Sequence, residues 1–390
     1  MKLDQLLVTL TAVMFVACTS TPTATPMPIP TPIATIAPSH TPTNVPTSTP
    51  RATETRAATP PATATTRPTV TPTPTPCTSS LRECAERKQI QIGIYLTGIW
   101  FPDPKWREIV GKEFNLAVVS SGFYWDDVES TRGQFNFSSP DEQAAFARSK
   151  NMLICGHALL LPAAPYIPDW LANGNFSRDD LTQILRNYIV QVMGRYKGRI
   201  SQYVVVEDPF PDSAQDVFYP KFGYDYIDLA FQAARETDPS AVLIFNAGDN
   251  ETSSGAMTQP TRQIVQRLKS KGLVDGVGLE MHLDGTLVYT KQDVIATMQS
   301  YGVPVYVTEI DIDLTNVPGT PEERYAKQAK MYGDMFAACL ESGVCKSFSV
   351  WGIGDKYSWL ERRSTNADPT PFDDNLNPKP AYFALLNLLR

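Results

Sequence analysis

The chain has 390 residues, with 34 Lys or Arg against 41 Asp or Glu, which gives a formal net charge of −7. This length suits one large domain or two ordinary ones. An acidic chain has no overall electrostatic attraction to nucleic acid, so we expect no nucleic-acid partner. The hydrophobic content of 42% supports a sizeable core once a proline-rich segment near the N-terminus is set aside.

Residues 1–18 have the pattern of an export signal. An apolar run from Leu6 to Ala17 ends directly before Cys18, and it is too short to span a bilayer as a mature helix. Small residues before a cysteine are typical of a bacterial lipoprotein signal, in which the cysteine is lipidated. We therefore predict lipidation at Cys18 and a secreted or cell-surface bacterial protein that meets the membrane only through this anchor. The alternatives are a simple cleaved signal and an uncleaved N-terminal anchor.

Residues 19–76 consist almost entirely of Thr, Pro, Ala and Ser, without an aromatic side chain. Proline removes backbone hydrogen-bond donors, and such a segment cannot bury enough apolar area to offset the entropy lost on ordering. We predict a disordered Thr/Pro-rich linker that holds the folded part, residues 77–390, away from the membrane.

Five further cysteines follow the predicted signal. Cys77 and Cys84 lie close together in the sequence, as do Cys339 and Cys345. Close spacing in an exported chain predicts two disulfides. Cys155 lies in an apolar run and is predicted to be a buried thiol. None of these spacings indicates a metal site, and we expect no metal or organic cofactor.

Eight short apolar runs alternate with longer amphipathic segments after residue 77. Helical periodicity is clearest in Asp179–Arg195 and Tyr224–Glu236. Strands that alternate with helices favour a parallel sheet, and eight such units predict an α/β fold of the (β/α)8 TIM barrel type. An open doubly wound sheet is the alternative, but no Gly-x-Gly-x-x-Gly turn follows the first run. The runs are Ile90–Tyr95, Leu116–Ser120, Met152–His157, Tyr203–Asp208, Val242–Asn246, Val277–His282, Val303–Ile312 and Ser347–Ile353.

Polar or indole side chains close most of these runs. In a (β/α)8 barrel the carboxyl ends of the strands form one face, where active sites are built. Residues scattered over much of the chain should therefore converge on one cleft. They are His157, Glu207, Asp208, Asn246, Glu280, His282, Glu309, Asp311 and Trp351.

Two carboxyl groups about 5–5.5 Å apart can hydrolyse a glycosidic bond with retention, one as nucleophile and one as acid/base. Glu309 ends an apolar strand and is the best nucleophile candidate, with His282 and Asp311 as the partners that keep it ionised. The second carboxyl should come from Glu207 or Asp208. The alternatives are that Glu309 only caps a following helix, and that the other pair is a polar strand end without proton transfer.

Aromatic side chains near the same ends could stack on the C–H faces of sugar rings. Trp351 and Trp359 bracket the exit of the last strand, while Trp125, Trp170 and Tyr166 follow the second and third strands. A tryptophan in such a place fits the core as well as it fits a ligand surface. We predict substrate contacts for Trp125, Trp351 and Trp359, and we favour Trp359 because its neighbours are polar.

The stretch from Leu81 to Leu389 resembles the family 10 glycoside hydrolases, most of which are endo-β-1,4-xylanases. The resemblance implies that Glu309 is the nucleophile, that His282 is its hydrogen-bond partner and that His157 binds sugar at the cleavage point. The matching stretches are Gly156-His157, Pro168-Asp169-Trp170, Gly194–Gly198, Thr308–Asp311, Trp351-Gly352, Asp355–Trp359, Asn377–Tyr382 and the pair Cys339/Cys345.

The departures from the family pattern fall in the active site. The family motif Trp-Asp-Val-Val-Asn-Glu ends in the acid/base, so Asp208 takes that position and Glu207 replaces the Asn that binds the sugar 2-hydroxyl. Aspartate is one methylene shorter, which withdraws its carboxyl by about 1.5 Å and weakens general acid catalysis. Glu280 replaces a Gln, and Gly248 stands where a Tyr is usual. Ser120–Tyr124 replaces the glycone-binding Glu-Asn-x-x-Lys.

The sequence therefore supports two hypotheses. The first is a monomeric, retaining, endo-acting hydrolase of β-1,4-linked xylan or a related plant-type β-glycan, with altered glycone specificity and with Glu280 and Asn246 among its substrate contacts. The second is a catalytically weak or inactive barrel that binds polysaccharide at the cell surface. Both have a polysaccharide as partner, and release of new reducing ends distinguishes them.

Overall fold

The computed structural model describes residue 77 and residues 79–96, 103–120, 122–163, 165–210, 216–361, 363–364 and 366–390. The predicted signal, the lipidation site Cys18 and the Thr/Pro-rich linker lie outside these residues. Among the described residues, no helix combines the length and the apolar character that crossing a bilayer requires.

Eight parallel strands form a closed barrel in which each strand pairs with its neighbours in sequence and the last pairs with the first. This confirms the predicted (β/α)8 fold, and every predicted run overlaps one strand. The bounds differ by a few residues at the ends because strand pairing, which the sequence pattern does not contain, decides where a strand stops. The strands are β1 Gln91–Leu96, β2 Leu116–Val119, β3 Leu153–Gly156, β4 Gln202–Glu207, β5 Val242–Gly248, β6 Gly276–Asp284, β7 Val305–Asp313 and β8 Cys345–Val350.

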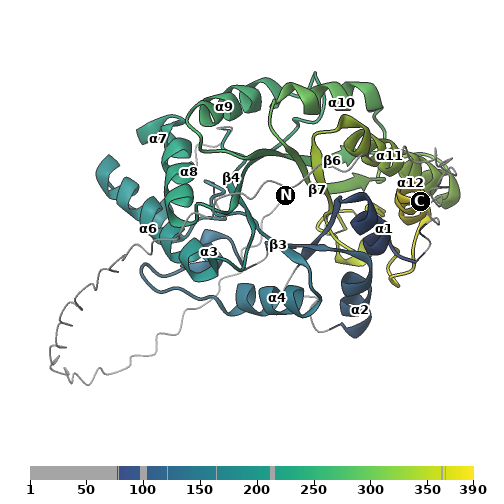
Figure 1. Ribbon diagram of the computed structural model, residues 1–390, viewed down its shortest axis with the longest axis horizontal. Coiled ribbons are helices and arrows are strands. Elements are labelled where there is room, and N and C mark those ends of the chain that lie inside the picture. The colour runs from purple at the N-terminus through teal and green to yellow at the C-terminus, as the bar shows by residue number, and fades with distance from the viewer. Residues whose placement is uncertain are drawn as a thin grey trace, which may run out of the picture. The chain divides into compact units, whose positions relative to one another are not determined.

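Helices surround the strands (Figure 1). The two longest, α6 and α11, each begin with a capping box, Ser177 with Asp180 and Thr320 with Glu323, which satisfies backbone donors of the first turn. The helices are α1 Leu81–Lys88, α2 Pro104–Glu113, α3 Trp125–Val128, α4 Ser138–Ser149, α5 Asp169–Ala172, α6 Arg178–Tyr196, α7 Tyr219–Phe222, α8 Asp225–Thr237, α9 Thr258–Ser270, α10 Lys291–Ser300, α11 Pro321–Ser342, the 3-10 turn η1 Asp355–Tyr357 and α12 Pro380–Leu389.

The barrel interior is filled by side chains rather than open. An inner apolar cluster includes Leu116, Val118, Val204, Ile244 and the free thiol of Cys155. Cys155 is buried as predicted, and burial raises the pKa of its thiol to about 12, which leaves it inert. Because this apolar layer fills the barrel, polar side chains at the carboxyl ends of the strands lie above a packed core.

Both predicted disulfides are present. Cys77–Cys84 joins the start of the folded part to α1, and Cys339–Cys345 joins the last turns of α11 to the first residue of β8. The second bond fixes the sharp turn at Gly343, whose φ of 72° lies in the left-handed region.

Candidate active site

The pairing of β6 with β7 aligns the two polar pairs that the sequence placed at their ends. Glu280 lies opposite Glu309, and His282 lies opposite Asp311. Residues two apart in a strand share a face, so all four side chains belong to the same face of the sheet. The register shifts at Leu279/Glu280, and such an irregularity beside an active site re-aims the side chains that follow it.

A chain of hydrogen bonds leads from Glu309 to an indole. Glu309 Oε2 lies 3.0 Å from His282 Nε2, and His282 Nδ1 lies 2.9 Å from Asp311 Oδ1. The Nε1–H of Trp359 donates to Asp311 Oδ2 at 2.7 Å. Because Trp359 holds Asp311 and Asp311 contacts His282 Nδ1, the His282 ring is oriented with its Nε2 toward Glu309. The structure thus brings together Glu309, His282 and Asp311, which were predicted as partners, and adds a contact of Trp359 with Asp311 that was not predicted.

The second oxygen of Glu309 has its own partners. Oε1 lies 3.1 Å from His157 Nε2 and accepts a hydrogen bond from Asn246 Nδ2 at 3.3 Å. Burial raises the pKa of Glu309, but the charges and hydrogen bonds of His157 and His282 outweigh it and lower the pKa to about 2. Glu309 is therefore a carboxylate throughout the neutral and mildly acidic range.

Glu207 ends β4 and approaches Glu309 through His157. Glu207 Oε2 lies 3.2 Å from His157 Nε2, and carboxylate oxygens of Glu207 and Glu309 and this imidazole all lie within 4.8 Å of one another. Burial raises the pKa of Glu207, and the nearby charge of Glu309 adds to the rise, while His157 opposes it. Two carboxyl groups thus lie at a separation compatible with retaining chemistry.

Asp208 follows β4 on an unusual backbone and is exposed to solvent. Its φ is +40°, a region that Asp tolerates better than most residues, and its Oδ1 accepts the Gly248 N–H at 2.9 Å. A Cβ added to Gly248 would lie 4.0 Å from this oxygen and 3.5 Å from Glu280 Oε2. The missing side chain at Gly248 therefore leaves open space between two acidic groups. Desolvation by surrounding atoms raises the pKa of Asp208, and the charge of Glu309 adds to it.

Glu280 is held by the same amide that contacts Glu309. Its Oε1 accepts from Asn246 Nδ2 at 2.9 Å, and Thr308 Oγ1 donates to Asn246 Oδ1 at 2.7 Å, which fixes the orientation of the amide. A Cβ on Gly278 would lie 2.0 Å from Asn246 Oδ1, so only glycine leaves room for the amide there. Burial raises the pKa of Glu280 well above its ordinary value, and the charges of Asp208, Glu309 and Glu207 raise it further.

Aromatic rings flank these polar groups. The Trp351 ring lies 5.2 Å from the His157 ring and 4.2 Å from the ring of Tyr95. The Trp359 ring lies 5.1 Å from that of His282. Both tryptophans therefore adjoin the residues around Glu309, where the sequence pattern predicts aromatic contacts to a sugar.

Comparison with known proteins agrees with this geometry. The model of glycosyl hydrolase family 10 matches residues 80–388. The chain belongs to this family. It is 30% identical over 319 residues to endo-1,4-beta-xylanase B of Thermotoga neapolitana, which covers 79% of this chain and 91% of the relative, and 31% identical over 281 residues to an endo-1,4-beta-xylanase of Agaricus bisporus, covering 70% and 83%. The crystal structure of xylanase 10B from Thermotoga petrophila in complex with xylobiose superposes with a TM-score of 0.74 at 30% identity, covering 80% of this chain and 98% of the other.

One predicted contact of this family 10 chain needs correction. Trp125 is only 1% exposed, its ring stacks on Tyr188 at 3.9 Å, and its Nε1–H donates to Glu129. It is a core residue, because α3 begins at this position and turns the indole inward. The preceding residue, Tyr124, is half-buried, and the charges of Glu207 and Glu309 act on its hydroxyl.

Tyr124 was not among the predicted site residues. Its hydroxyl accepts a hydrogen bond from Ser120 at 3.0 Å, and its ring lies 4.8 Å from that of Tyr166, which is 38% exposed. Burial raises the pKa of Tyr124 well above its ordinary value, and the charges of Glu207 and Glu309 add to the rise. The only signal in the sequence was its position, where the family has a lysine.

Two groups in the described residues have donor atoms close enough to hold a metal ion, His157 with Glu207 and Glu309, and Glu280 with His282 and Glu309. Burial lowers the pKa of both histidines, but their carboxylate partners outweigh it and raise the pKa well above the ordinary value. A protonated imidazole has no lone pair to give a metal, so these groups are better explained as ion pairs.

Proposed function

We propose that the chain is an exported, retaining, endo-acting hydrolase of β-1,4-linked xylan or a related plant-type β-glycan, with altered glycone specificity. The observation that carries the proposal is the ionised Glu309, held between His157 and His282, with Glu207 close by and Asp208 near enough for the charge of Glu309 to raise its pKa. The xylanase relatives support xylan as the substrate class. Lipidation at Cys18 and a monomeric state are part of the same proposal.

Glu309 attacks the anomeric carbon, and the bond to the leaving sugar breaks as its oxygen takes a proton from the acid/base. The resulting glycosyl–Glu309 ester is hydrolysed by a water whose proton returns to the acid/base. His282 and His157 stabilise the carboxylate that leaves in this second step. Their positive charges also favour Glu309 as a leaving group.

We assign the acid/base to Asp208 rather than to Glu207. The acid must reach an oxygen that departs with a solvent-bound sugar, and Asp208 is exposed while Glu207 is 6% exposed and paired with His157. The raised pKa of Asp208 suits a group that must carry a proton. Glu207 then faces the sugar ring bound at the cleavage point.

Altered glycone specificity is supported by Tyr124, which stands where the family has a charged lysine. Tyr124 and Tyr166 present an aromatic pair next to Glu207 and Glu309. Aromatic faces stack on sugar C–H faces, whereas the lysine that Tyr124 replaces binds hydroxyls. We expect the preferred sugar chain to make fewer hydrogen bonds through its hydroxyl groups on the glycone side of the cleft.

The experiment compares the wild type with Glu309→Gln, Asp208→Asn and Glu207→Gln on soluble xylan and other soluble β-glycans, measured as new reducing ends. Loss in Glu309→Gln by at least about 10³-fold is expected for a nucleophile. If Asp208 is the acid/base, azide should restore cleavage of an activated aryl glycoside in Asp208→Ala but not in Glu207→Ala. Full activity of Glu309→Gln would refute the mechanism.

A second candidate function, a polysaccharide-binding barrel without catalysis, is favoured by the shortened acid/base at Asp208. It predicts binding of the same glycans, measured by affinity electrophoresis, without new reducing ends in the wild type.

A further inference from the structure

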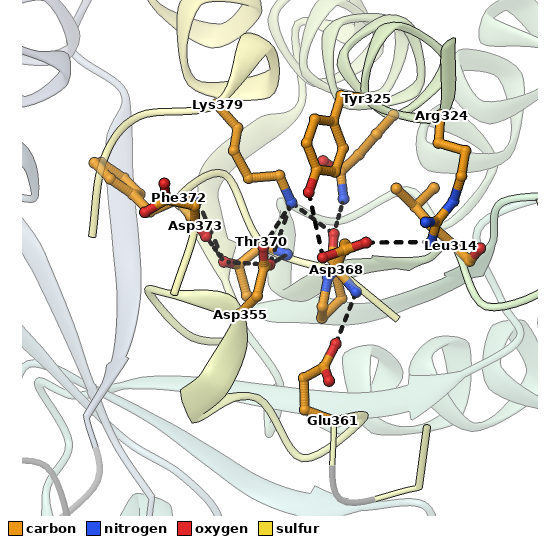
Figure 2. A network of polar contacts seen from close by, with 12 residues as sticks. Leu314, Arg324, Tyr325, Asp355, Glu361, Asp368, Thr370, Phe372, Asp373 and Lys379 are labelled. Carbon is orange, nitrogen blue, oxygen red and sulfur yellow. Dashed lines mark hydrogen bonds and ion pairs between the residues drawn. The ribbon is translucent and has the colours of Figure 1, made fainter. Parts of the chain in front are cut away.

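A buried ion pair lies outside the cleft, between η1 and the start of α12 (Figure 2). The side chains of Lys379 and Asp355 are each 3% exposed, and Lys379 Nζ lies 2.9 Å from Asp355 Oδ2. Lys379 Nζ also donates to the Asp368 carbonyl at 2.7 Å, while Asp355 Oδ1 accepts from the Thr370 N–H at 2.8 Å. Both charges thus have several hydrogen-bond partners.

This ion pair organises the segment between β8 and α12. The segment is tied to the exit of β7, because the Ile312 N–H donates to the Pro369 carbonyl at 3.2 Å and the Leu314 N–H donates to the Ala367 carbonyl at 2.8 Å. On its outer side Arg324 of α11 lies 3.2 Å from Asp368 Oδ2. The segment therefore runs alongside the end of the strand that carries Glu309.

Trp359 lies between the two points at which this segment is held. On one side is Asp355, in the ion pair, and on the other is Glu361, whose Oε1 accepts the Asp368 N–H at 2.9 Å. Between them Trp359 directs its Nε1–H to Asp311. A loop fixed at both ends holds an indole in one orientation, while a loose loop would let it turn away.

We propose that the Asp355–Lys379 ion pair is a positioning element for the nucleophile, holding the Trp359 indole on Asp311 and thereby His282 on Glu309. The inference rests on the proposed function for its kinetic readout. Replacing a buried ion pair by apolar groups often costs little stability, so a role in fixing orientation is one reason for such a pair to be kept.

The kinetic test is a double-mutant cycle between Lys379→Met and Trp359→Phe, with kcat/KM measured as a function of pH. Each single variant should lower kcat/KM about tenfold, the effect of one hydrogen bond to a charged group, and should move the acid limb to higher pH. The double variant should be no worse than Trp359→Phe, because both changes act through one hydrogen bond. Multiplicative losses, or an unmoved acid limb in Lys379→Met, would overturn the proposal.

The control is Arg235→Met, which removes a partly exposed ion pair between Arg235 of α8 and Asp275, the residue directly before β6. It should lower the melting temperature without moving the acid limb. Asp355→Asn is the second variant, since it keeps the size and the acceptor for Thr370 if Lys379→Met does not fold. It should reproduce the shift of the acid limb.

A readout independent of activity separates this inference from the proposed function. The chain has three histidines, so the His282 ring can be followed by NMR of labelled histidine in the full-length protein. Asp355→Asn should change the His282 signals and lower the pKa of its imidazole, even if the wild type cleaves no glycan. An unchanged His282 titration in this variant would refute the positioning role, whereas an inactive wild type with a changed titration would refute only the hydrolase.

Discussion

Replacing His282 with glutamine should move the acid limb of kcat/KM to higher pH. Glutamine can still donate a hydrogen bond to Glu309, but it carries no charge and cannot be polarised by Asp311. Glu309 reacts only as a carboxylate, so its pKa sets the acid limb. His282 Nε2 lies 3.0 Å from Glu309 Oε2, and its loss leaves His157 as the one imidazole beside the nucleophile in the described residues.

The expected size follows from the pKa of Glu309. A value of about 2 in place of 4.5 corresponds to about 3 kcal/mol of net stabilisation of the carboxylate. The two histidines together supply more than this net figure, because they also offset the desolvation of Glu309. If His157 and His282 contribute comparably, the variant loses more than about 1.5 kcal/mol and the acid limb rises by more than roughly one pH unit. The lowered pKa of Glu309 also makes the stability of the fold depend on pH. A lowered carboxyl pKa stabilises the fold above pH 4.5, and this stabilisation is lost as the pH falls through about 2.

The assay is the initial rate of glycan cleavage at substrate concentrations well below KM, between pH 2 and 7, with unfolding followed in parallel. Asp313→Asn is the control, because Asp313 lies on β7 beyond Asp311 and binds the Thr315 N–H rather than His282. An acid limb that stays in place in His282→Gln, or that moves equally in Asp313→Asn, would show that His282 does not hold Glu309 ionised.

Two further predictions concern residues next to this chain of contacts. Glu280→Gln keeps an acceptor for Asn246 and removes a carboxyl whose pKa is raised by burial and by like charges. A carboxyl with a raised pKa destabilises the fold increasingly as pH rises above 4.5. The melting temperature of the variant should therefore rise relative to that of the wild type between pH 5 and pH 8. A difference that shrinks over this range would contradict the assignment. Trp125→Ala should cost about 3–5 kcal/mol of stability, because the ring is stacked on Tyr188 in the core, while KM on the folded protein stays the same. A raised KM at full stability would place Trp125 in the cleft after all.

The fold could be predicted because its signal is periodic and repeated. Eight β-branched runs separated by amphipathic segments have few topologies open to them, and barrel closure then brings the strand ends to one face. Glu309, His282 and Asp311 could be placed together for the same reason. They lie in the carboxyl-terminal halves of neighbouring strands, and the spacing of two between Glu309 and Asp311 keeps these on one face.

The rest of the site depends on loops, and loop geometry is not periodic. Trp125 and Tyr124 are adjacent in sequence, and only the start of α3 decides which ring enters the core and which turns toward Glu207. The ion pair between Asp355 and Lys379 could not be predicted from the sequence for a related reason. Each residue alone looks like an ordinary surface charge, and the contact joins positions on either side of an irregular segment.

The acidic residues of the site form two groups whose pKa values are shifted in opposite directions. Glu309, between two imidazoles, is held as a carboxylate, while Asp208 and Glu280 have raised pKa values through desolvation and neighbouring negative charge. A retaining hydrolase needs this asymmetry, with one carboxyl ionised and one protonated.

The two departures from the family pattern at Asp208 and Glu280 have different consequences. Asp208 has lost reach, which weakens a general acid. Burial and the charges of Asp208, Glu309 and Glu207 raise the pKa of Glu280 well above its ordinary value, so its protonated form is favoured. A protonated carboxyl is neutral, as the family's glutamine is, so the substitution at Glu280 adds no case for an inactive barrel. The lost reach at Asp208 does favour a weak or inactive barrel, and release of new reducing ends tests it.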